Sequence, residues 1–367
     1  MRLASPLLKR AVYPALHHTG WFNHSMPPGG FAVVNYHGVI PGGHSSDDPF
    51  LDGHLIAPDI LREQLRFLKA HYSVIEPEKF REFVELGRPL PPRAVLITCD
   101  DGLDNPLTEM LTVLQEEKVP CLFFVTAASC REDPGMLWFE ELYQLMRRQG
   151  SSNPAPQFLP ESASDNSAKS FQDWWWSAVR AASRFDAETR AIWMQEFRVR
   201  YGALPSEFEK RYRLLNLFEL KRLSDAGMSI GAHTCTHPIL AASNDQNAYR
   251  EIHEGKLRLE RVTGKPVWAL AYPFGNPSTM GEREFRLARQ AGYSCAFLNV
   301  EHWEGQQMNP FALCRTHVTS KMSLPELAAH LSGMHARLQR AVGPKISFFR
   351  KRSADLNCKS TALVESL

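Results

Sequence analysis

The chain has 367 residues, enough for one large domain with insertions, and it is 44% hydrophobic and 22% charged, which excludes disorder along its whole length. Its 42 basic and 40 acidic side chains leave a formal charge of +2, too small for the broad positive field of a nucleic-acid-binding protein. We therefore expect neither DNA nor RNA as a partner.

The seven cysteines are odd in number and include no C-x-x-C pair, which is typical of reduced thiols in a cytosolic protein. Basic residues and Pro14 interrupt the apolar run near the amino terminus before a secretion signal could form. No window reaches the roughly 18 apolar residues of a membrane span. We expect a cytoplasmic protein, with peripheral contact to the inner membrane surface as an open alternative.

Short β-rich runs alternate with helical patterns along the chain, which favours a parallel sheet or barrel over a sandwich. The predicted strands are residues 31–36, 95–99, 121–125, 228–232, 267–271, 295–298 and 313–318. Apolar residues at helical spacing predict helices over 58–70 and 285–290. The expected fold class is α/β, with the strands closing into a (β/α) barrel.

One stretch, from about residue 134 to 217, has no predicted strand and is rich in aromatic and charged residues. Its flanks at 138–148 and 174–201 have helical patterns, and a polar, proline-containing run at 151–170 predicts a loop. We predict a helical insertion on the rim of a barrel that spans 31–341. An N-terminal extension at 1–30 and a polar tail at 342–367 complete the predicted organisation.

Two adjacent carboxylates, Asp100 and Asp101, come directly before Gly102 at the end of the strand predicted over 95–99. An acidic pair before glycine is by itself typical of a turn or a helix cap. At the carboxyl end of a barrel strand, however, such a pair faces the active-site mouth. One carboxylate can then bind a cation while the other, kept ionised beside it, acts as a base.

Two histidines, His233 and His237, follow the strand predicted over 228–232. A spacing of four residues arises easily by chance in a chain with 14 histidines. In a helical turn at a strand end, the two imidazoles can converge on one zinc ion. Two histidines and one carboxylate leave coordination positions open for water, which is typical of a catalytic zinc site.

Two further strand ends carry a turn and a histidine. The run Tyr272-Pro273-Phe274-Gly275 is typical of a plain turn, although such a turn can also aim backbone N–H groups into a pocket as an oxyanion hole. His37 follows the first predicted strand, where a lone histidine more often packs than reacts.

Together these residues resemble the polysaccharide deacetylase family, the NodB-like carbohydrate esterases of family four. The run from Thr98 to Gly102 is similar to the family's T-F-D-D-G motif with cysteine in place of phenylalanine, and His233 to His237 is similar to its H-[ST]-x-x-H motif. The resemblance covers about 31–335 apart from the insertion. It implies a distorted barrel of NodB type that removes acetyl groups from an N-acetylated sugar by hydrolysis.

Two features resemble one branch of this family, the branch of the poly-N-acetylglucosamine and biofilm-adhesin deacetylases. The run from Ala271 to Gly275 stands where most of the family has R-P-P-Y-G. Tyr36-His37 matches a Y-H motif that supplies the general acid in this permuted branch.

Carried over residue by residue, the resemblance implies three ligands of a divalent metal, expected to be Zn²⁺: Asp101, His233 and His237. Asp100 would be the general base that accepts a proton from the attacking water, whose pKa the metal lowers toward about 7. The backbone N–H of Phe274 would help to stabilise the anionic carbonyl oxygen. His37, in its protonated form, would then donate a proton to the leaving amine.

The chain departs from the family pattern at the residue that orients the base, because Ala271 replaces the family arginine. Arg315 is the candidate substitute, since a guanidinium can hold Asp100 through two hydrogen bonds; a surface arginine is the alternative. The family's D-x-x-D-W motif is absent, and we expect His317 to be structural and Cys235 not to bind the metal.

The insertion carries tryptophans that either line a sugar-binding rim or, as is more usual for aromatic residues in helices, pack against the domain beneath. They are Trp138, Trp174, Trp175 and Trp176.

The expected activity is metal-dependent removal of acetyl groups from the N-acetylated sugars of a polysaccharide, or of a lipid-linked or nucleotide-linked glycan precursor. An O-acetyl esterase is an alternative, because the same attack by water cleaves esters. A non-catalytic glycan-binding relative is a second alternative, which the intact set of Asp100, Asp101, His233 and His237 argues against.

Overall fold

The computed structural model describes residues 8–24, 30–40, 51–148, 171–202, 204–205, 211–301, 309–335 and 337. The loop predicted at 151–170 and the tail predicted at 342–367 lie outside the described residues. The chain divides into two compact units, one of residues 26–324 and one of residues 1–25 together with 325–367.

The larger unit is built on a parallel sheet of eight strands. They are β1 (Phe31–Tyr36), β2 (Ser73–Val74), β3 (Ala94–Cys99), β4 (Leu122–Val125), β5 (Ser229–Ala232), β6 (Ala269–Ala271), β7 (Cys295–Phe297) and β8 (Thr316–His317). Their order is β7-β6-β5-β4-β3-β1-β8, and β2 pairs with β3. Ahead of β8, Leu313 pairs with Phe297 of β7, while Thr316 pairs with Val34 of β1. The segment from Leu313 to Thr316 therefore joins β7, at one end of the strand order, to β1 near the other end. This closure confirms the predicted distorted (β/α) barrel.

The seven predicted strands are all present, most of them within two residues of the predicted ends. β1, β3 and β4 are buried apolar runs, as expected of parallel strands covered on both faces. The predicted strand at 313–318 contains only the two-residue β8. The two-residue β2 was not predicted, because two residues are too few to show a period.

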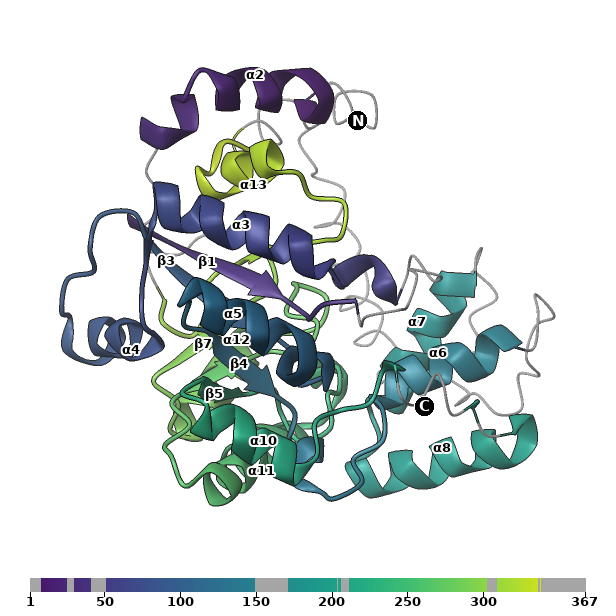
Figure 1. Ribbon diagram of the computed structural model, residues 1–367. Coiled ribbons are helices and arrows are strands. Elements are labelled where there is room, and N and C mark those ends of the chain that lie inside the picture. The colour runs from purple at the N-terminus through teal and green to yellow at the C-terminus, as the bar shows by residue number, and fades with distance from the viewer. Residues whose placement is uncertain are drawn as a thin grey trace, which may run out of the picture. The chain divides into compact units, whose positions relative to one another are not determined.

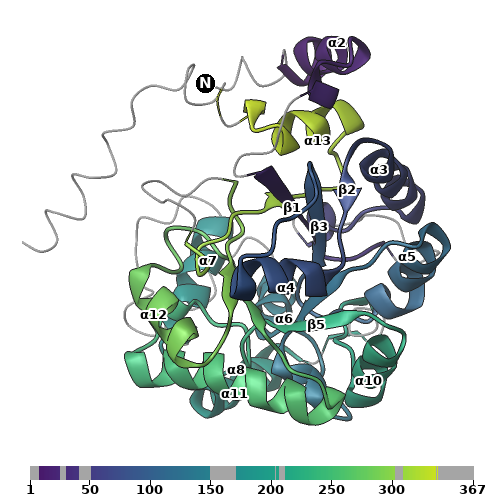
Figure 2. The same cartoon turned by 90° about the vertical axis from the view of Figure 1, so that its left-hand side faces the viewer.

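Helices surround the sheet (Figure 2). They are α3 (Pro58–His71), α4 (Pro77–Leu86), α5 (Leu111–Glu117), α10 (Leu217–Asp225), α11 (Asp245–Thr263) and α12 (Glu282–Gln290). Shorter 3₁₀ or π turns are η4 (Asp52–His54), η5 (Pro106–Met110), η6 (Ala127–Cys130) and η9 (Leu240–Ala242). Side chains such as Leu96, Phe124 and Phe297 form an apolar cluster in the interior of the barrel.

In the described residues of the predicted insertion the helices are α6 (Trp138–Arg148), α7 (Phe171–Ala182) and α8 (Ala187–Tyr201). The helix predicted over 174–201 is in fact two helices, because the Asp186 side chain accepts a hydrogen bond from Thr189 N and starts a new helix there. Leu214 N donates to Gly135 O at 2.9 Å, so the two ends of the segment lie side by side. Figure 1 shows α6, α7 and α8 beside the carboxyl ends of the strands.

The smaller unit contains η1 (Leu8–Val12), α2 (Tyr13–His18), η2 (Trp21–His24) and α13 (Leu324–Leu331), which begins at its border. Lys9 pairs with Glu326 at 2.5 Å, and the Tyr13 hydroxyl bonds His335 Nδ1 at 2.7 Å. Of the described helices in either unit, none is both long enough and apolar enough to cross a bilayer.

Candidate functional site

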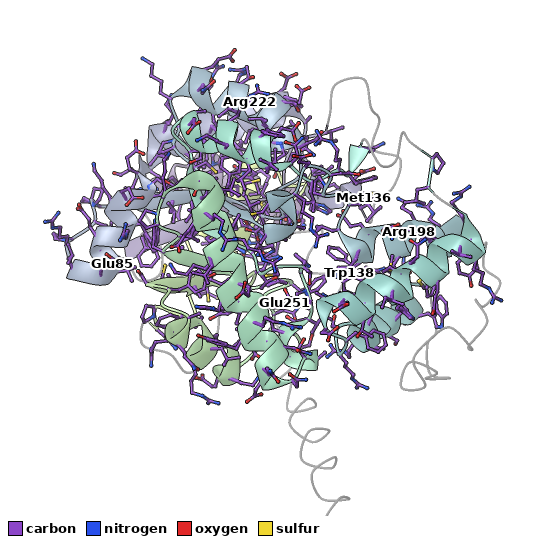
Figure 3. All side chains as sticks on the ribbon, turned by 90° about the horizontal axis from the view of Figure 1, so that it is seen from below. Glu85, Met136, Trp138, Arg198, Arg222 and Glu251 are labelled. Carbon is purple, nitrogen blue, oxygen red and sulfur yellow. The ribbon has the colours of Figure 1, made fainter. Side chains whose placement is uncertain are left out.

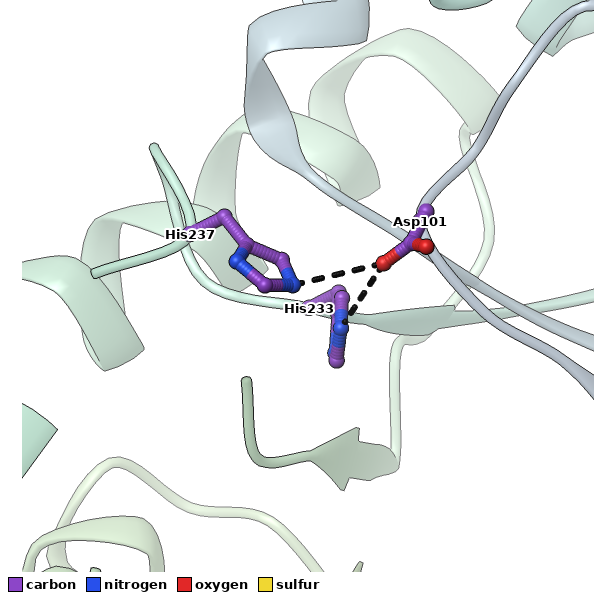
Figure 4. A group of neighbouring side chains, drawn as sticks. All are labelled: Asp101, His233 and His237. Atoms are coloured by element: carbon purple, nitrogen blue, oxygen red, sulfur yellow. Dashed lines mark ion pairs between the residues drawn. The ribbon is translucent and has the colours of Figure 1, made fainter. Parts of the chain in front are cut away.

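Two strand ends bring a carboxylate and two imidazoles together. Asp101 follows β3 with a left-handed backbone of φ 75°, and His233 follows β5. Gly102 comes next at φ 81°, where an added Cβ would lie 2.7 Å from a methyl group of Val125. Asp101 Oδ1 lies 3.3 Å from Nε2 of His233 and 3.3 Å from Nε2 of His237 (Figure 4).

These three side chains have the composition and burial of a cation site. All three are buried, and their ligand atoms lie within 4.8 Å of one another. His233 Nδ1 donates to the Ala271 carbonyl oxygen at 2.8 Å, which leaves the lone pair on Nε2 facing Asp101. One carboxylate oxygen and two imidazole nitrogens are a donor set that suits a divalent cation such as Zn²⁺.

The second carboxylate, Asp100, is held by a buried arginine. Arg315 Nη1 donates to Asp100 Oδ1 at 2.7 Å, and Arg315 Nη2 donates to Oδ2 at 2.6 Å. Asn35 Nδ2 donates to Oδ2 at 3.0 Å. Burial alone would raise the pKa of Asp100, but the charge and hydrogen bonds of Arg315, together with nearby His233 and His37, outweigh burial and hold that pKa below the usual 3.8. Asp100 is therefore an ionised acceptor.

Arg315 is itself fixed on several sides and is only 1% exposed. Its Nε donates to the Leu298 carbonyl oxygen at 2.8 Å, and its Nη1 also reaches Asn35 Oδ1 at 3.0 Å. The guanidinium lies over the Phe124 ring, 5.4 Å from its centre. The two hydrogen bonds expected between Arg315 and Asp100 are thus present, and the alternative of a surface arginine is wrong.

His37 lies in the same cleft among other imidazoles. Its ring stacks on His317 at 4.6 Å between centroids and meets the His54 ring at 5.2 Å. Burial, followed by the nearby His317, lowers the pKa of His37 well below 6.5. Among the described residues His37 Nδ1 has no hydrogen-bond partner. The imidazole is therefore neutral in this state, whereas the resemblance implies a protonated general acid.

The turn after β6 places Phe274 in the cleft at φ 60°. Its backbone N–H makes no hydrogen bond to another described residue, so it is available as a donor. Gly275 N donates to Pro273 O at 2.7 Å, and a Cβ on Gly275 would lie 2.5 Å from Asn299 N. The turn can exist only with glycine at this position, because it passes so close to the next strand end.

The cleft has a volume of about 380 Å³ and is lined from two sides. The barrel supplies Asp100, Asp101, His233, His237, His37 and Phe274 among others, and the insertion supplies Phe139, Glu140, Gln172, Asp173, Trp175 and Trp176. Such a volume is typical of a pocket for a small organic group.

Glu140 was not among the predicted site residues. Its carboxyl group is buried on α6, its Oε2 has no hydrogen-bond partner among the described residues, and burial followed by the charge of Asp101 raises its pKa well above 4.5. Glu140 lies on the buried side of α6 with Tyr143 and Gln144. An acidic residue inside the apolar stripe of a predicted helix was the signal that could have identified it.

The tryptophans of the insertion pack against their neighbours, as the more usual alternative predicted, and two of them also line the cleft. Trp175 is 4% exposed, stacks on Trp176 at 5.1 Å, and both line the cleft. Trp174 packs against the hydrophobic cluster of the insertion. Trp138 Nε1 donates to the His237 carbonyl oxygen at 3.3 Å, which ties α6 to a proposed metal ligand.

For two residues near the site, His317 and Cys235, we predicted no direct part in the chemistry. His317, expected to be structural, lines the cleft and stacks on His37. Cys235 is buried, which raises the pKa of its thiol, and its sulfur does not belong to the cluster formed by Asp101, His233 and His237.

Comparison with known proteins finds similarity to polysaccharide deacetylases. The polysaccharide deacetylase family model matches residues 197–296. A poly-β-1,6-N-acetyl-D-glucosamine N-deacetylase of Escherichia coli K12 is 30% identical over 98 residues, which are 26% of this chain and 14% of that protein. The protein from E. coli O157:H7 of the same name matches equally. The chain therefore aligns with only a small part of these curated relatives.

Similar solved structures extend over most of the chain. The Streptococcus pyogenes deacetylase PplD has a TM-score of 0.53 at 16% identity and covers 83% of this chain and 99% of its own. IcaB from Ammonifex degensii has a TM-score of 0.52 at 16% identity, covering 84% and 99%. At such identities these likenesses establish the fold. With the family match and the motifs, they confirm the predicted resemblance of this chain to the NodB-like polysaccharide deacetylase family, in the branch of the poly-N-acetylglucosamine and biofilm-adhesin deacetylases.

Proposed function

We propose that this protein is a metal-dependent hydrolase that removes acetyl groups from the N-acetylated sugars of a polysaccharide or glycan precursor. The observation that carries the proposal is the pairing of two carboxylates with different partners in one buried cleft. Asp101 faces His233 and His237, while Asp100 faces Arg315. A site that only bound glycan would not need an ionised base beside a cation site.

Asp101, His233 and His237 would hold the divalent cation, proposed to be Zn²⁺. A cation there would polarise the acetamide carbonyl and make water a stronger acid. Asp100, kept ionised by Arg315, accepts the proton of the water that adds to the carbonyl carbon. The Phe274 N–H donates a hydrogen bond to the carbonyl oxygen as negative charge develops there.

His37 is the proposed donor to the leaving nitrogen. As the C–N bond breaks, the nitrogen takes a proton and leaves as a free amine, and acetate is the second product. Because His37 is neutral in the free site, it must gain a proton before it donates one; the proton that Asp100 takes from the attacking water balances this step, and its transfer returns Asp100 to the ionised form. The charges of Asp100 and Asp101 raise its pKa and so favour this step, whereas burial and His317 oppose it.

The proposed substrate class is an N-acetylated amino sugar, supported by the family match and by the relatives named as poly-β-1,6-N-acetyl-D-glucosamine N-deacetylases. The lipid-linked or nucleotide-linked precursor, the cytoplasmic location and the contact with the inner membrane surface rest on the sequence alone and stay predictions.

The test measures acetate and new primary amine from N-acetylated β-1,6-glucosamine oligomers, together with bound zinc. The parent should release both products in equal amounts, Asp100→Asn should keep its zinc and lose acetate release by about 10²-fold or more, and Asp101→Asn should lose both. Acetate released only from O-acetylated oligosaccharides would assign the esterase alternative. A parent that binds glycan and zinc without releasing acetate would contradict hydrolysis.

A further inference from the structure

The segment that carries two proposed ligands has a strained backbone. We call residues 233–239 the metal loop. Thr234 and His237 have φ values of 65° and 59°, in the left-handed region that residues other than glycine rarely adopt. Each such residue costs on the order of 1–3 kcal/mol and persists only where its surroundings hold it. Inside the loop, one hydrogen bond joins these two residues, from His237 N to Thr234 Oγ1 at 3.1 Å. The other contacts that hold the strained backbone come from outside the loop.

One source of support is a buried arginine of the insertion. Arg190, on α8, is 3% exposed, and its guanidinium donates to Thr236 Oγ1 in the metal loop and to Glu251 Oε1 on α11. Glu251 Oε2 accepts from Thr236 N at 2.8 Å. Arg190 and Glu251 therefore grip the same loop residue, one from the insertion and one from the barrel.

A second source is α6, which touches the ligand itself. Trp138 Nε1 donates to the His237 carbonyl oxygen, and the Phe139 ring lies 4.7 Å from the His237 ring. The Arg190 guanidinium lies over the Trp138 ring at 5.1 Å, so the α6 and α8 contacts support each other.

A third contact comes from the turn between α7 and α8. Ser183 Oγ accepts a hydrogen bond from Ile239 N at 3.0 Å, and the Ser183 carbonyl oxygen accepts one from Ser243 Oγ at 2.8 Å. The insertion thus bonds the metal loop at Thr236, His237 and Ile239, three positions within four residues.

We infer that the insertion is a clamp on the metal loop, and that Arg190 is a positioning residue that fixes His237 Nε2 beside Asp101. The inference rests on the proposed metal site. Arg190 contacts neither the cleft nor the three ligand atoms, so it acts through Thr236. Its loss would leave Glu251 buried without a cationic partner and the loop free to relax from the left-handed backbone.

The chain offers a matched control on the same helix. Arg198 lies two turns beyond Arg190 on α8 and makes two hydrogen bonds to the Glu141 carboxylate, but it has no bond to the metal loop. Figure 3 labels Arg198 and Trp138, both on the insertion, and Glu251 on α11. Arg198→Met therefore removes a more exposed arginine–glutamate pair between α8 and α6, with the arginine side chain 41% exposed, and leaves the contacts of the insertion with Thr236, His237 and Ile239 in place.

The experiment titrates metal-free full-length protein with Co²⁺ and follows the visible absorption of the bound ion, which reports ligand number and geometry. Arg190→Met should weaken Co²⁺ binding by about 10-fold or more and change the spectrum, as is usual when a group that orients a ligand is lost. Arg198→Met should keep the parent affinity and spectrum. Arg190→Met/Glu251→Gln removes the pair without leaving a buried unpaired charge, and it decides the question if the single variant does not fold.

Parent affinity and spectrum in a folded Arg190 variant would overturn the clamp while leaving the proposed function standing. Equal weakening by Arg198→Met would also overturn it, because the effect would then be one of general stability. A parent that binds no Co²⁺ would overturn both the clamp and the metal site.

Discussion

Arg315 and Asp100 stand 215 positions apart in the chain, and two hydrogen bonds of 2.7 and 2.6 Å join them inside the barrel. The family arginine that orients the base would stand at Ala271, on β6, but here the guanidinium comes from the segment ahead of β8. The interaction that the resemblance implies for that arginine is thus made here by a residue next to a different strand. The barrel permits this because the ends of its parallel strands converge on one cleft.

Arg315→Lys should lower kcat by about 10²-fold with little change in Co²⁺ affinity. The lysine ammonium lacks the planar fork that holds both oxygens, so Asp100 turns out of position. The shorter lysine places its charge farther from the carboxylate and cannot make both hydrogen bonds, so the pKa of Asp100 rises, and a base must be ionised to act. In a plot of kcat/KM against pH, the acidic limb should therefore move to higher pH.

Arg289→Lys is the control for this variant. Arg289, on α12, lies over the Phe311 ring at 4.9 Å and does not line the cleft. It should leave both kcat and the acidic limb in place. An unchanged acidic limb in Arg315→Lys would mean that Arg315 does not set the ionisation of the base.

His37→Ala should reduce turnover by about 10²- to 10⁴-fold, the usual contribution of a general acid, while zinc content stays near that of the parent. The deficit should shrink for a substrate with a better leaving group than an amine, such as an acetyl ester, because that group departs without full protonation. Parallel measurements of zinc content and of amide and ester cleavage test this. Equal loss of zinc and of activity would assign His37 to the metal site.

The sequence predicted the strands well because a parallel sheet buried on both faces requires continuous apolar runs ended by turn residues. β1 is predicted with the bounds it has, and Asp101, His233 and His237 are brought together because strand ends meet at one edge of a barrel. Arg315 was named because it stands beside another strand end.

Contacts made by the insertion could not be predicted in the same way. Arg190 meets Thr236 and Glu251 across 46 and 61 positions, and no local pattern encodes how three helices pack on a loop. The break before α8 did have a local signal, since Asp186 accepts from Thr189 N as an N-cap residue does. Ionisation depends on packing too, which is why the neutral state of His37 was not expected.

Glu140→Gln should stabilise the metal-free protein, and more so at pH 8 than at pH 5. Burial raises the folded-state pKa of Glu140 above its unfolded value, so the unfolded chain loses this proton first as pH rises. The parent then loses stability between the unfolded and folded pKa values, and glutamine, which stays neutral, does not. Urea unfolding in the presence of a chelator at both pH values measures the difference.

The neighbouring Glu141 provides the control, because its carboxylate accepts two hydrogen bonds from Arg198. Glu141→Gln should weaken that pair and give no gain in stability at pH 8. A gain from Glu140→Gln that is the same at pH 5 and pH 8 would show that ionisation of Glu140 is not its source.

Gly255→Ala should destabilise the protein by about 1–3 kcal/mol and weaken Co²⁺ binding. In an ordinary helix interior this change would be stabilising by about 0.5–1 kcal/mol, because alanine is the better helix former. Gly255, however, lies on α11 against the metal loop, and a Cβ there would be 2.9 Å from the carbonyl carbon of Thr234 and 3.2 Å from Cys235 N. Backbone atoms cannot rotate away, so the loop must shift.

Glu254→Ala is the control, because Glu254 lies on the same helix with a side chain that is 41% exposed, and this change should leave Co²⁺ affinity unchanged. If Gly255→Ala instead stabilised the protein and kept its affinity, α11 would not support the metal loop.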